Sequence, residues 1–295
     1  MPVDWPANAA VVVLSYGAGP VVGLVTALAA EGVPCSQVFV VHNPGPGGRH
    51  CPDLGCDAIV LERASNDGYG TAMNEGILAA RQTGADFAVL CTHDVQVSAQ
   101  VLRSLVEILR LAPTIAAAGP VLTDDGDGAF SAGGRMRLGR PSHVAPTGAG
   151  TKSVDWLDGS VLAVRLDLPR YFREDFFLYW EDIDFARNLR RRGYDVVCVQ
   201  SLRAVSTPGN RHSRSNLYAF LRFRNGLLAA RGDRAWAEML AISALLILKA
   251  IRSLVTDTSG EGRRTSAVLF RALRDGWQGH SGRPHASVLA GSDAV

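Results

Sequence analysis

The sequence lacks a strong excess of either charge. Its 30 Lys and Arg residues nearly balance 28 Asp and Glu residues, and the formal net charge is +2. A dedicated nucleic-acid-binding protein is expected to carry a strongly basic face, so no nucleic-acid partner is predicted. Hydrophobic residues make up 47% of the chain and charged residues 20%. This composition excludes a disordered chain and indicates a globular protein with a sizeable core.

Cysteine is scarce, and its 5 positions form an odd, scattered set. Only Cys51 and Cys56 are near each other, and no second Cys or His pair accompanies them, which argues against a zinc site. Free thiols in a reducing compartment are therefore expected. The N-terminus also lacks a basic segment followed by an apolar run, so no secretory signal is predicted. The expected location is cytoplasmic, either free or peripheral at the inner face of the membrane.

Long hydrophobic runs are also missing. The longest is the decapeptide Met239–Leu248, which is followed by Lys249 and Arg252. A membrane-spanning helix needs about 20 apolar residues, so none is predicted. Two interpretations of the decapeptide stay open. One is a helix of the core or of a homodimer, and the other is an interfacial helix in peripheral contact with a membrane. The amphipathic stretch 263–277, rich in arginine, fits both.

Strand-like and helix-like stretches alternate through the first half of the chain. Short apolar runs separated by helices of about 10–15 residues are typical of right-handed βαβ units with a parallel sheet. The predicted strands are 10–16, 37–42, 58–61 and 87–91, and the predicted helices are 20–30, 70–82 and 99–111.

The alternation is expected to stop after residue 123. Segment 123–151 is rich in Gly, Asp and Pro and is predicted to hold loops or a small hairpin. An extended segment, a helix, a strand and a mostly helical C-terminal part are predicted after it, at 153–164, 181–192, 196–199 and from 215 onward. The predicted fold class is therefore α/β, a mostly parallel sheet flanked by helices with a helical C-terminal extension.

Polar residues follow each predicted strand of the first half. They lie at 15–16, 42–43, 62–70 and 92–95. Because open parallel sheets bind ligands in the crevice at the carboxyl ends of their strands, we expect these four segments to meet at one site.

The third of these segments contains Asn66 and leads into a predicted helix. Glycines before a helix let the backbone approach a ligand, and the free N–H groups of its first turn favour phosphate. A dinucleotide fingerprint would need a glycine where Met73 stands, and it would follow the first strand. A sugar-nucleotide loop and a plain turn are the remaining alternatives.

Acidic residues occur at two other places in the first half. Asp94 follows a predicted strand, where a carboxylate is well placed to hold a divalent cation against a diphosphate, although one aspartate there is also ordinary. Asp124, Asp125 and Asp127 lack the spacing of a calcium loop and are interpreted as a solvated turn.

The stretch from Phe176 to Asp184 passes from aromatic residues directly into acids that open a helix. Acids in a first turn suit the helix dipole, and aromatics fill a core, so capping is one explanation. The other is that a carboxylate beside Trp180 is tuned by its apolar surroundings to act as a general base.

In their order along the chain these segments resemble glycosyltransferase family 2, and within it the bacterial rhamnosyltransferase- and galactofuranosyltransferase-like members. The resemblance runs from about Val11 to Arg231. It rests on VVVLSYG, VFVVHN, the Asn66-to-Gly76 loop, THDV, VDWLDGSVLAVR and FFLYWEDIDFARNLRRRGY.

This resemblance implies a GT-A fold that binds a nucleotide diphosphosugar. The implied domains are a GT-A domain at 1–232, a helical extension at 233–278 and a disordered tail at 279–295. The implied partners are a dTDP-, UDP- or GDP-linked sugar and a glycan, lipid-linked or small-molecule acceptor, in cell-wall or polysaccharide biosynthesis.

The resemblance also implies roles for single residues. Asp182 would be the catalytic base, with Glu181 beside it, and Asp94 would bind Mg²⁺ or Mn²⁺. Nucleotide-sugar binding would fall to Ser15, Tyr16, Asn43, Asn66, Gly68, Gly70, Asn74, His93 and Asp94. The donor and acceptor pocket would be formed by Trp156, Asp158, Gly159 and Trp180.

The sequence departs from the family pattern at three positions. His42 stands where many members carry an aspartate that contacts the base or ribose, and Thr92-His93-Asp94 carries one acid where two are common. The metal-binding histidine of the family falls near Ser206 here. His212 either substitutes for it or is a surface histidine. A non-catalytic nucleotide-sugar-binding protein and a nucleotidyltransferase are the alternative functions.

Overall fold

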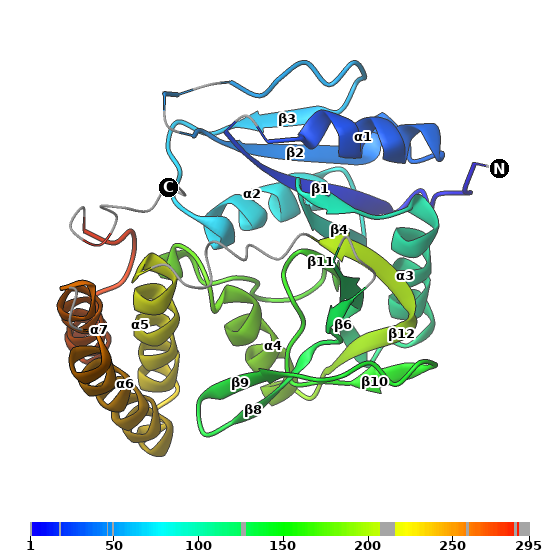
Figure 1. Ribbon diagram of the computed structural model, residues 1–295. Coiled ribbons are helices and arrows are strands. Elements are labelled where there is room, and N and C mark those ends of the chain that lie inside the picture. The colour runs from blue at the N-terminus through cyan, green and yellow to red at the C-terminus, as the bar shows by residue number, and fades with distance from the viewer. Residues whose placement is uncertain are drawn as a thin grey trace. The chain divides into compact units, whose positions relative to one another are not determined.

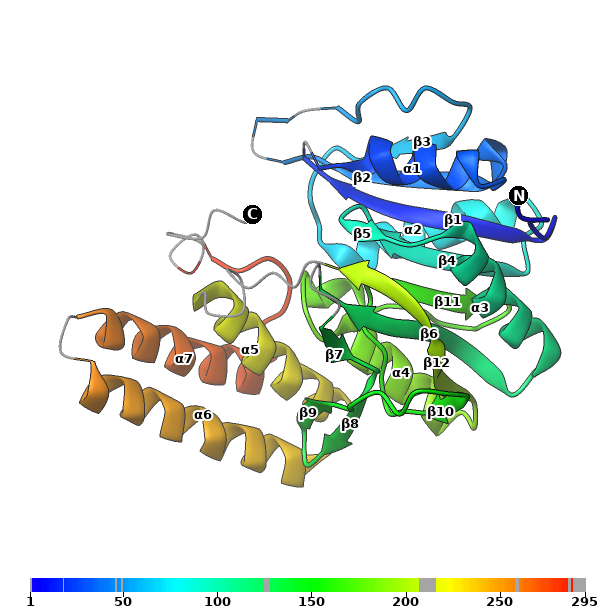
Figure 2. The same cartoon turned by 45° about the vertical axis from the view of Figure 1, so that its right-hand side comes forward.

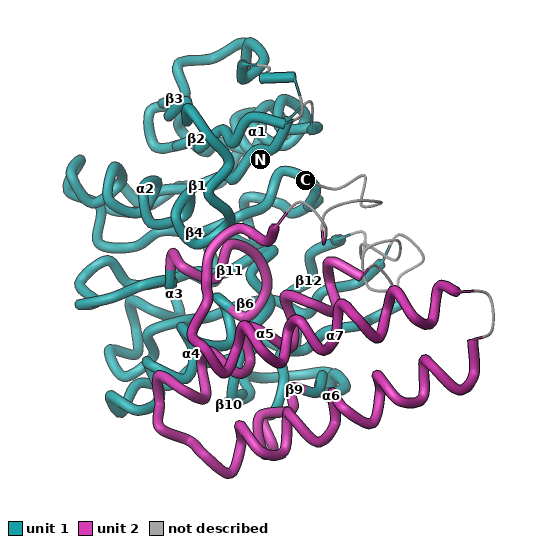
Figure 3. Tube along the Cα trace, turned by 90° about the vertical axis from the view of Figure 1, so that its left-hand side faces the viewer, with its two compact units in different colours: residues 1–135, 142–173, 181–208 teal, residues 136–141, 174–180, 209–295 magenta. Residues whose placement is uncertain are grey.

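A computed structural model describes residues 2–17, 19–45, 47–48, 50–124, 128–206, 216–257, 260–285 and 288. The chain forms two compact units (Figure 3), the first made of 1–135, 142–173 and 181–208, and the second of 136–141, 174–180 and 209–295. The domain limits predicted from the sequence stay a prediction.

The first unit is an α/β structure, as predicted, built on a mixed sheet (Figure 1). Its helices are α1 Val21–Ala30, η1 Cys35–Gln37, α2 Tyr69–Gln82, α3 Ala99–Leu111 and α4 Glu181–Arg191. Its strands are β1 Ala9–Tyr16, β2 Val38–Asn43, β3 Ile59–Glu62, β4 Phe87–Thr92, β5 Val95–Gln96, β6 Ile115–Thr123, β7 Ala129–Ser131, β10 Thr151–Ser153, β11 Val161–Arg165 and β12 Asp195–Ser206.

The strand order of the sheet is β10-β12-β6-β11-β4-β1-β2-β3, with β5 beside β12 and β7 beside β6. β1, β2, β3 and β4 run parallel to one another, because helices or long crossovers connect them. β11 is antiparallel to both of its neighbours, β4 and β6. The C-terminal ends of the four parallel strands therefore share one edge of the sheet.

Helices cover both faces of this sheet (Figures 1 and 2). The buried face of α1 packs with α3 in one apolar cluster that includes Val11, Val13, Val38 and Val40 of β1 and β2. α2 lies on the other face, where a Cβ on Gly76 would come within 2.3 Å of Val12 Cγ1. Side chains alternate between the two faces of a strand, so the unbroken apolar run of β1 serves both layers.

Two of the longer strands of the sheet were missed or were predicted too short, and the short β5 and β7 were not predicted either. β6 was missed, because its sequence IAAAGPVLT is rich in alanine and contains a Gly-Pro pair. β12 extends to Ser206, seven residues beyond the predicted end. Segment 123–151 holds the predicted hairpin, formed by β8 Gly134–Arg137 and β9 Arg140–His143.

The second unit is helical. Apart from the short η2 Glu174–Phe176, its helices are α5 Asn216–Gly232, α6 Trp236–Thr256 and α7 Glu261–Gln278. The three long helices pack on one another around an apolar cluster that includes Phe220, Leu246 and Leu269. Among the described residues, α6 is long and apolar enough to cross a membrane by length and composition alone. It is thus twice as long as the predicted apolar decapeptide.

The described residues that follow α7 lie in the segment predicted to be a disordered tail, and some of them make contacts with the second unit. Gly279 caps α7 with a left-handed backbone, φ 83°. The backbone of Gly282 donates to Asp175 O and accepts from Arg224, while the guanidinium of Arg283 lies 5.7 Å from the ring centroid of Phe177. These contacts fold the segment up to residue 285 onto the second unit.

Candidate functional site at the carboxyl edge of the sheet

The carboxyl ends of the parallel strands lie side by side, as predicted from the strand pattern. Ser15 is opposite His42 and Tyr16 is opposite Asn43 in the register of β1 and β2. Beyond the strand ends, the N–H of Gly17 donates to Asn43 O at 3.1 Å. On the other side of β1, the N–H of His93 donates to Leu14 O at 3.0 Å. Hydrogen bonds thus join the first, second and fourth predicted segments.

Two residues at this edge are buried against each other. Ser15 and His42 have no exposed surface, and Ser15 Oγ lies 3.2 Å from His42 Nδ1. This contact gives Ser15 a structural role, and its predicted contact with nucleotide stays a prediction. His42 stands where many family members carry an aspartate. In this chain its side chain contacts Ser15.

Asn43 is different, because part of its side chain has no partner. It is 3% exposed, and its Nδ2 donates to Gly68 O at 3.5 Å. Its Oδ1 is buried with no hydrogen-bond partner among the described residues. A buried amide oxygen without a donor is costly, so an N–H or O–H of a ligand would relieve the cost. Tyr16, next to Asn43 in the register, is half-buried.

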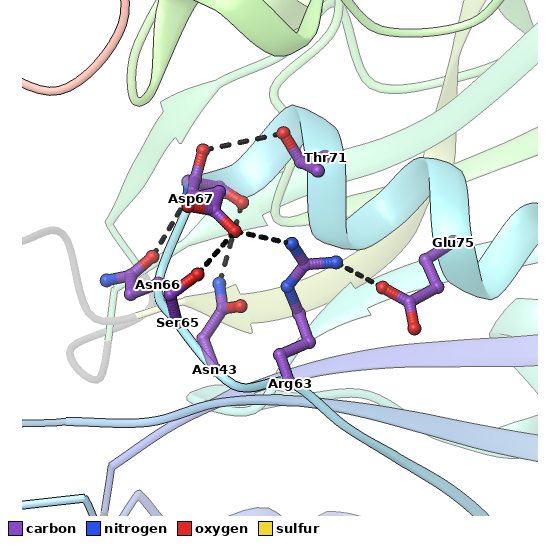
Figure 4. A network of polar contacts seen from close by, with 8 residues as sticks. Asn43, Arg63, Ser65, Asn66, Asp67, Thr71 and Glu75 are labelled. Carbon is purple, nitrogen blue, oxygen red and sulfur yellow. Dashed lines mark hydrogen bonds and ion pairs between the residues drawn. The ribbon is translucent and has the colours of Figure 1, made fainter.

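The loop between β3 and α2 is held by a polar network (Figure 4). Arg63 pairs with Asp67 at 2.9 Å and with Glu75 of α2, and Ser65 Oγ donates to Asp67 at 2.7 Å. Asn66 Oδ1 accepts from the N–H of Gly68 at 3.0 Å. The network fixes the loop before the N-terminus of α2, where free N–H groups favour an anion.

The glycines of this loop serve different purposes. Gly68 precedes α2 with φ 99°, a conformation that favours glycine. Gly70 is small for packing, because a Cβ there would lie 2.5 Å from Arg173 O. Asn74 uses both of its polar atoms on the backbone of Phe172, at 2.9 and 3.1 Å. Gly70 and Asn74 therefore have structural roles, and their predicted ligand contacts stay predictions.

The most distinctive arrangement of the site surrounds Asp182, in the first turn of α4. The N–H of Gly159 donates to Asp182 Oδ2 at 3.3 Å, and the N–H of Ile183 donates to Oδ1 at 2.8 Å. On the other side of the Gly159 Cα, the hydroxyl of Tyr69 donates to Gly159 O at 2.7 Å. A Cβ on Gly159 would lie 2.9 Å from that hydroxyl oxygen. Gly159 therefore lets α2 and α4 meet around one residue, through the two peptide groups that flank its Cα.

The electrostatic environment of Asp182 is that of a proton acceptor. Burial first, and the negative charge of Asp158 second, raise the pKa of Asp182 to about 7, while the N–H groups of Ile183 and Gly159 act in the opposite direction. Burial likewise raises the pKa of Tyr69 well above its usual value, so its hydroxyl stays a donor. A carboxylate with a pKa near neutrality is suited to general-base catalysis.

A chain of backbone contacts connects Asp182 with the end of β4. Ser160, next to Gly159, accepts a hydrogen bond from the N–H of Thr92 at 3.0 Å. Asp94 follows Thr92 by two residues, so Asp94 and Asp182 belong to the same edge of the first unit. The predicted convergence of these two carboxylates at one site is compatible with this geometry.

The surroundings of Asp94 suit a cation that the protein and a substrate bind together. They do not suit a cation bound by protein ligands alone. The side chain of Asp94 is exposed to solvent. No group of three or more His, Cys, Asp or Glu that could hold a metal occurs within the described part of the chain. Mg²⁺ is commonly bound by one or two carboxylates together with substrate phosphates and water. His212, the second predicted ligand, lies outside the described residues.

His93 and Trp156 are packed against glycines. A Cβ on Gly19 would lie 2.3 Å from His93 Nε2, and one on Gly134 would lie 2.1 Å from Trp156 Cε2. Trp156 also has a T-shaped contact with His143, at 5.0 Å between ring centroids. Its Nε1 is buried without a hydrogen-bond partner in the described structure.

Trp180 and Glu181 are adjacent in sequence but belong to different units. Glu181 is buried in the first unit. Trp180 belongs to the second unit, where a Cβ on Gly226 would lie 2.8 Å from its ring.

The segment just before α4 has an unusual backbone. Phe177, Tyr179 and Trp180 all have positive φ angles, of 69°, 68° and 78°. Such residues cost of order 1–3 kcal/mol each and are kept only where surrounding contacts hold them. Within the second unit, Asn225 Nδ2 lies 3.1, 2.9 and 2.8 Å from the carbonyl oxygens of residues 176, 178 and 179.

Sequence analysis missed Asn225, its neighbour Arg224, and Tyr69. Arg224 donates to Phe176 O at 2.9 Å, and burial lowers its pKa to about 10. Their partners are 48 and 49 residues away, and Tyr69 meets Gly159 across 90 residues. No local sequence pattern predicts contacts between residues this far apart in the chain. The Arg63–Asp67 pair, by contrast, has the i,i+4 spacing that sequence can show.

A separate hollow of about 750 Å³ opens beside α1. Its lining includes Glu31, Ser98, Thr123 and Arg203 but none of the predicted site residues. Its lining includes Val95, the residue after Asp94, but neither Asp94 nor Asp182.

The sheet order and the edge that carries these side chains define a GT-A glycosyltransferase fold. The sequence profile of the family described as "Glycosyltransferase like family 2" matches residues 6–226. The chain therefore belongs to this family, as the resemblance implied. The rhamnosyl and galactofuranosyl subtypes are not distinguished by this match. Comparison with curated protein sequences gives no match.

Solved glycosyltransferase structures share the fold at low sequence identity. A mannosyltransferase from Pyrobaculum calidifontis, in complex with GDP-Man and Mn²⁺, matches with a TM-score of 0.55 and 15% identity, covering 94% of this chain and 90% of the other. GalNAc-T7, with UDP, GalNAc and Mn²⁺, gives 0.56 and 10%, covering 76% and 47%. TarS of S. aureus gives 0.53 and 13%, covering 95% and 50%. The chain thus spans about half the length of GalNAc-T7 and TarS.

Proposed function

We propose that the protein is an inverting glycosyltransferase that uses a nucleotide diphosphosugar, with Asp182 as its general base. The observation that carries this proposal is the Asp182 carboxylate, held by the N–H of Gly159 beside the end of β4, with its pKa raised to about 7. A base with a pKa near the working pH combines a large ionised fraction with a strong tendency to accept a proton.

The reaction we propose is a single displacement. Asp182 accepts the proton of an acceptor hydroxyl while the hydroxyl oxygen forms a bond to the anomeric carbon. The bond from that carbon to the diphosphate oxygen breaks, and the nucleoside diphosphate leaves with the electron pair. One displacement inverts the anomeric configuration. Asn43 Oδ1 and the N-terminus of α2 would bind the nucleotide part of the donor.

Asp94 is the residue proposed to hold a divalent cation, Mg²⁺ or Mn²⁺. Such a cation would neutralise charge on the leaving diphosphate. Support comes from the exposed carboxylate at the carboxyl edge and from two structural neighbours of the fold that were solved with Mn²⁺. Glu181, Trp156, Asp158 and Gly159 would complete the surroundings of the sugar.

The proposed donor is a hexose-type sugar on UDP, GDP or dTDP. Two neighbours of the fold were solved with UDP or GDP-Man, which supports this chemical class without selecting a base. The sequence motifs favour a rhamnosyl- or galactofuranosyl-type transfer. The acceptor would be a hydroxyl group of a glycan, of a lipid-linked sugar or of a small molecule, in the synthesis of a cell wall or polysaccharide.

Turnover of a donor panel by the wild type and Asp182→Asn tests the proposal. UDP-, GDP- and dTDP-sugars are supplied with Mn²⁺ or Mg²⁺, and release of the nucleoside diphosphate is measured. Loss of a general base is expected to slow turnover about 10²–10⁴-fold. Asp167→Asn, at an exposed aspartate paired with Arg165, is the matched control and is expected to stay active. Donor binding without turnover by the wild type would overturn the catalytic assignment, as would near-normal turnover by Asp182→Asn.

The pH dependence of stability shows whether Asp182→Asn is folded. Because the pKa of Asp182 is raised in the folded chain, its neutral form stabilises the protein below the unfolded-state pKa. This contribution is lost as the pH rises to about 7. The asparagine variant has no carboxyl group to ionise, so it does not lose stability in this way. At pH 8 its free energy of unfolding is expected to be about 1–3 kcal/mol higher than that of the wild type. The difference should disappear near pH 4 in denaturant titrations.

A further inference from the structure

One face of α6 is apolar and exposed along almost its whole length. Leu240, Ala244, Leu248, Ile251 and Val255 follow one another at intervals of three or four residues, so they lie on a single stripe of the helix. Leu248 is 66% exposed and Val255 is 74% exposed. We call these five residues the α6 stripe. Soluble monomers rarely expose a contiguous apolar surface of this kind without a function.

The opposite face of α6 is already occupied. Met239, Ile242, Leu246 and Ala250 are buried in the core that α6 shares with α5 and α7. A membrane-spanning helix outside a bundle exposes every face to lipid, whereas one face of α6 is buried against α5 and α7. Lys249 and Arg252 also stand in its C-terminal half. This arrangement is that of a helix that lies on a surface and not one that crosses a bilayer.

Basic residues surround the stripe. The second unit carries thirteen Lys and Arg residues and seven Asp and Glu residues over its described part. Exposed arginines of α7, Arg263, Arg264 and Arg274, accompany Lys249 and Arg252 of α6. The pKa of Lys249 is lowered by burial first and then by Arg222, Arg140 and Arg252, which reflects a positive local potential. A second copy of this chain would bring two such positive surfaces together.

Exposed aromatic residues occur beside these charges. Trp236 begins α6 and is 58% exposed, and Phe270 and Trp277 of α7 are exposed as well. Tryptophan is favoured at the level of lipid headgroups, where its ring is partly in apolar surroundings and partly in water. Apolar stripe, basic flank and aromatic residues together match an anionic membrane surface better than any protein partner.

We propose that α6, with the basic face of α7, docks on an anionic lipid bilayer with the α6 stripe inserted among the headgroups. The proposal concerns the second unit alone and does not depend on the glycosyl transfer. Docking is measured as binding, without turnover, so its failure and the failure of the proposed function give separate results.

Co-sedimentation of the full-length protein with vesicles tests the docking. One set of vesicles is phosphatidylcholine alone, and the other contains phosphatidylglycerol as well. Each basic residue near an anionic surface is worth about fivefold in binding, so the anionic set is expected to bind the protein at least about tenfold more tightly. Raising the salt concentration is expected to reduce this difference. Equal or absent binding to both sets would overturn the proposal.

Substitutions on the stripe separate the apolar from the ionic contribution. Leu248→Glu combined with Ile251→Glu is expected to weaken binding to anionic vesicles by about tenfold or more, because two inserted side chains become charged. The matched control is Leu111→Glu, at a leucine of α3 that is 67% exposed, and it is expected to bind like the wild type. Circular dichroism confirms that each variant is folded.

The oligomeric state tests the alternative that a second copy of the chain covers the α6 stripe. Light scattering without vesicles is expected to show the same mass for the wild type and the double variant. A dimer that the double variant abolishes, together with no vesicle binding, would assign the stripe to a second copy and overturn the proposal.

Discussion

At the scale of single residues, the candidate site depends on one glycine. The N–H of Gly159 donates to Asp182, and its carbonyl accepts from Tyr69. The sequence indicated Asp182 and Gly159 through their motifs, but it did not show that Tyr69, the first residue of α2, holds Gly159 from the other side. Tyr69 is therefore best described as a positioning residue of the proposed base, because it acts through Gly159.

Two substitutions are predicted to move the pH profile in opposite directions. Asp158→Asn removes a negative charge that raises the pKa of Asp182, so the acidic limb of kcat/KM should move to lower pH. Tyr69→Phe leaves Gly159 O without its donor and loosens the N–H that lowers that pKa, so the limb should move to higher pH. Rates measured from pH 5 to 9 give both shifts.

The direction of these shifts distinguishes positioning from simple loss of stability. A purely structural effect of Tyr69→Phe would lower the rate equally at every pH. A shift of both variants in the same direction would contradict the account of Asp182. Activity below pH 7 should be low in the wild type, because the base is then mostly protonated.

At the scale of elements, local signals predicted helices better than strand pairing. α3 has the predicted bounds, because Ser98 caps it through a hydrogen bond from the N–H of Val101 and its leucines repeat at helical spacing. β6 was missed, because it has few β-branched residues. Its conformation is determined by the strands on both sides, β12 and β11. Tertiary pairing overrides weak local preference there.

The segment before α4 is the element most dependent on distant contacts, and Asn225→Ala tests this. The substitution removes the amide that contacts three carbonyl groups of the left-handed segment 176–180. Unfolding in urea is expected to become easier by about 2–4 kcal/mol, since buried carbonyl groups lose their donor and the strained backbone loses its support.

A second asparagine of α5 is the control for this prediction. Asn216 makes a side-chain contact with Thr265 Oγ1 at 3.1 Å and is half-buried. Asn216→Ala is expected to cost about 1 kcal/mol or less. Equal losses in the two variants would mean that the left-handed segment does not depend on Asn225.

At the scale of the whole molecule, hydrogen exchange with and without a donor tests which unit holds the site. UDP- or GDP-sugar with Mn²⁺ is expected to slow exchange at 42–43, 66–70, 92–95 and 157–160, because bound ligand stabilises the local structure by mass action. The amides of α6 and α7 are expected to change little. Asp94→Asn should reduce the effect of Mn²⁺ on this protection.

Protection confined to the helical unit would contradict the assignment of the donor site to the sheet edge. Protection that is identical with and without Mn²⁺ in the wild type would contradict the metal role proposed for Asp94.

The sequence by itself determined the α/β class, the parallel first half, the order of motifs and the family, because apolar runs and breakers are local properties of a chain. It also identified Asp94 and Asp182 as candidates. Only the tertiary structure showed which contacts the candidates make within the protein, as with Ser15, Gly70 and Asn74. Tertiary structure alone also brought Tyr69 and Asn225 to their partners and left one face of α6 uncovered, since contacts between distant residues have no signature in their local sequence.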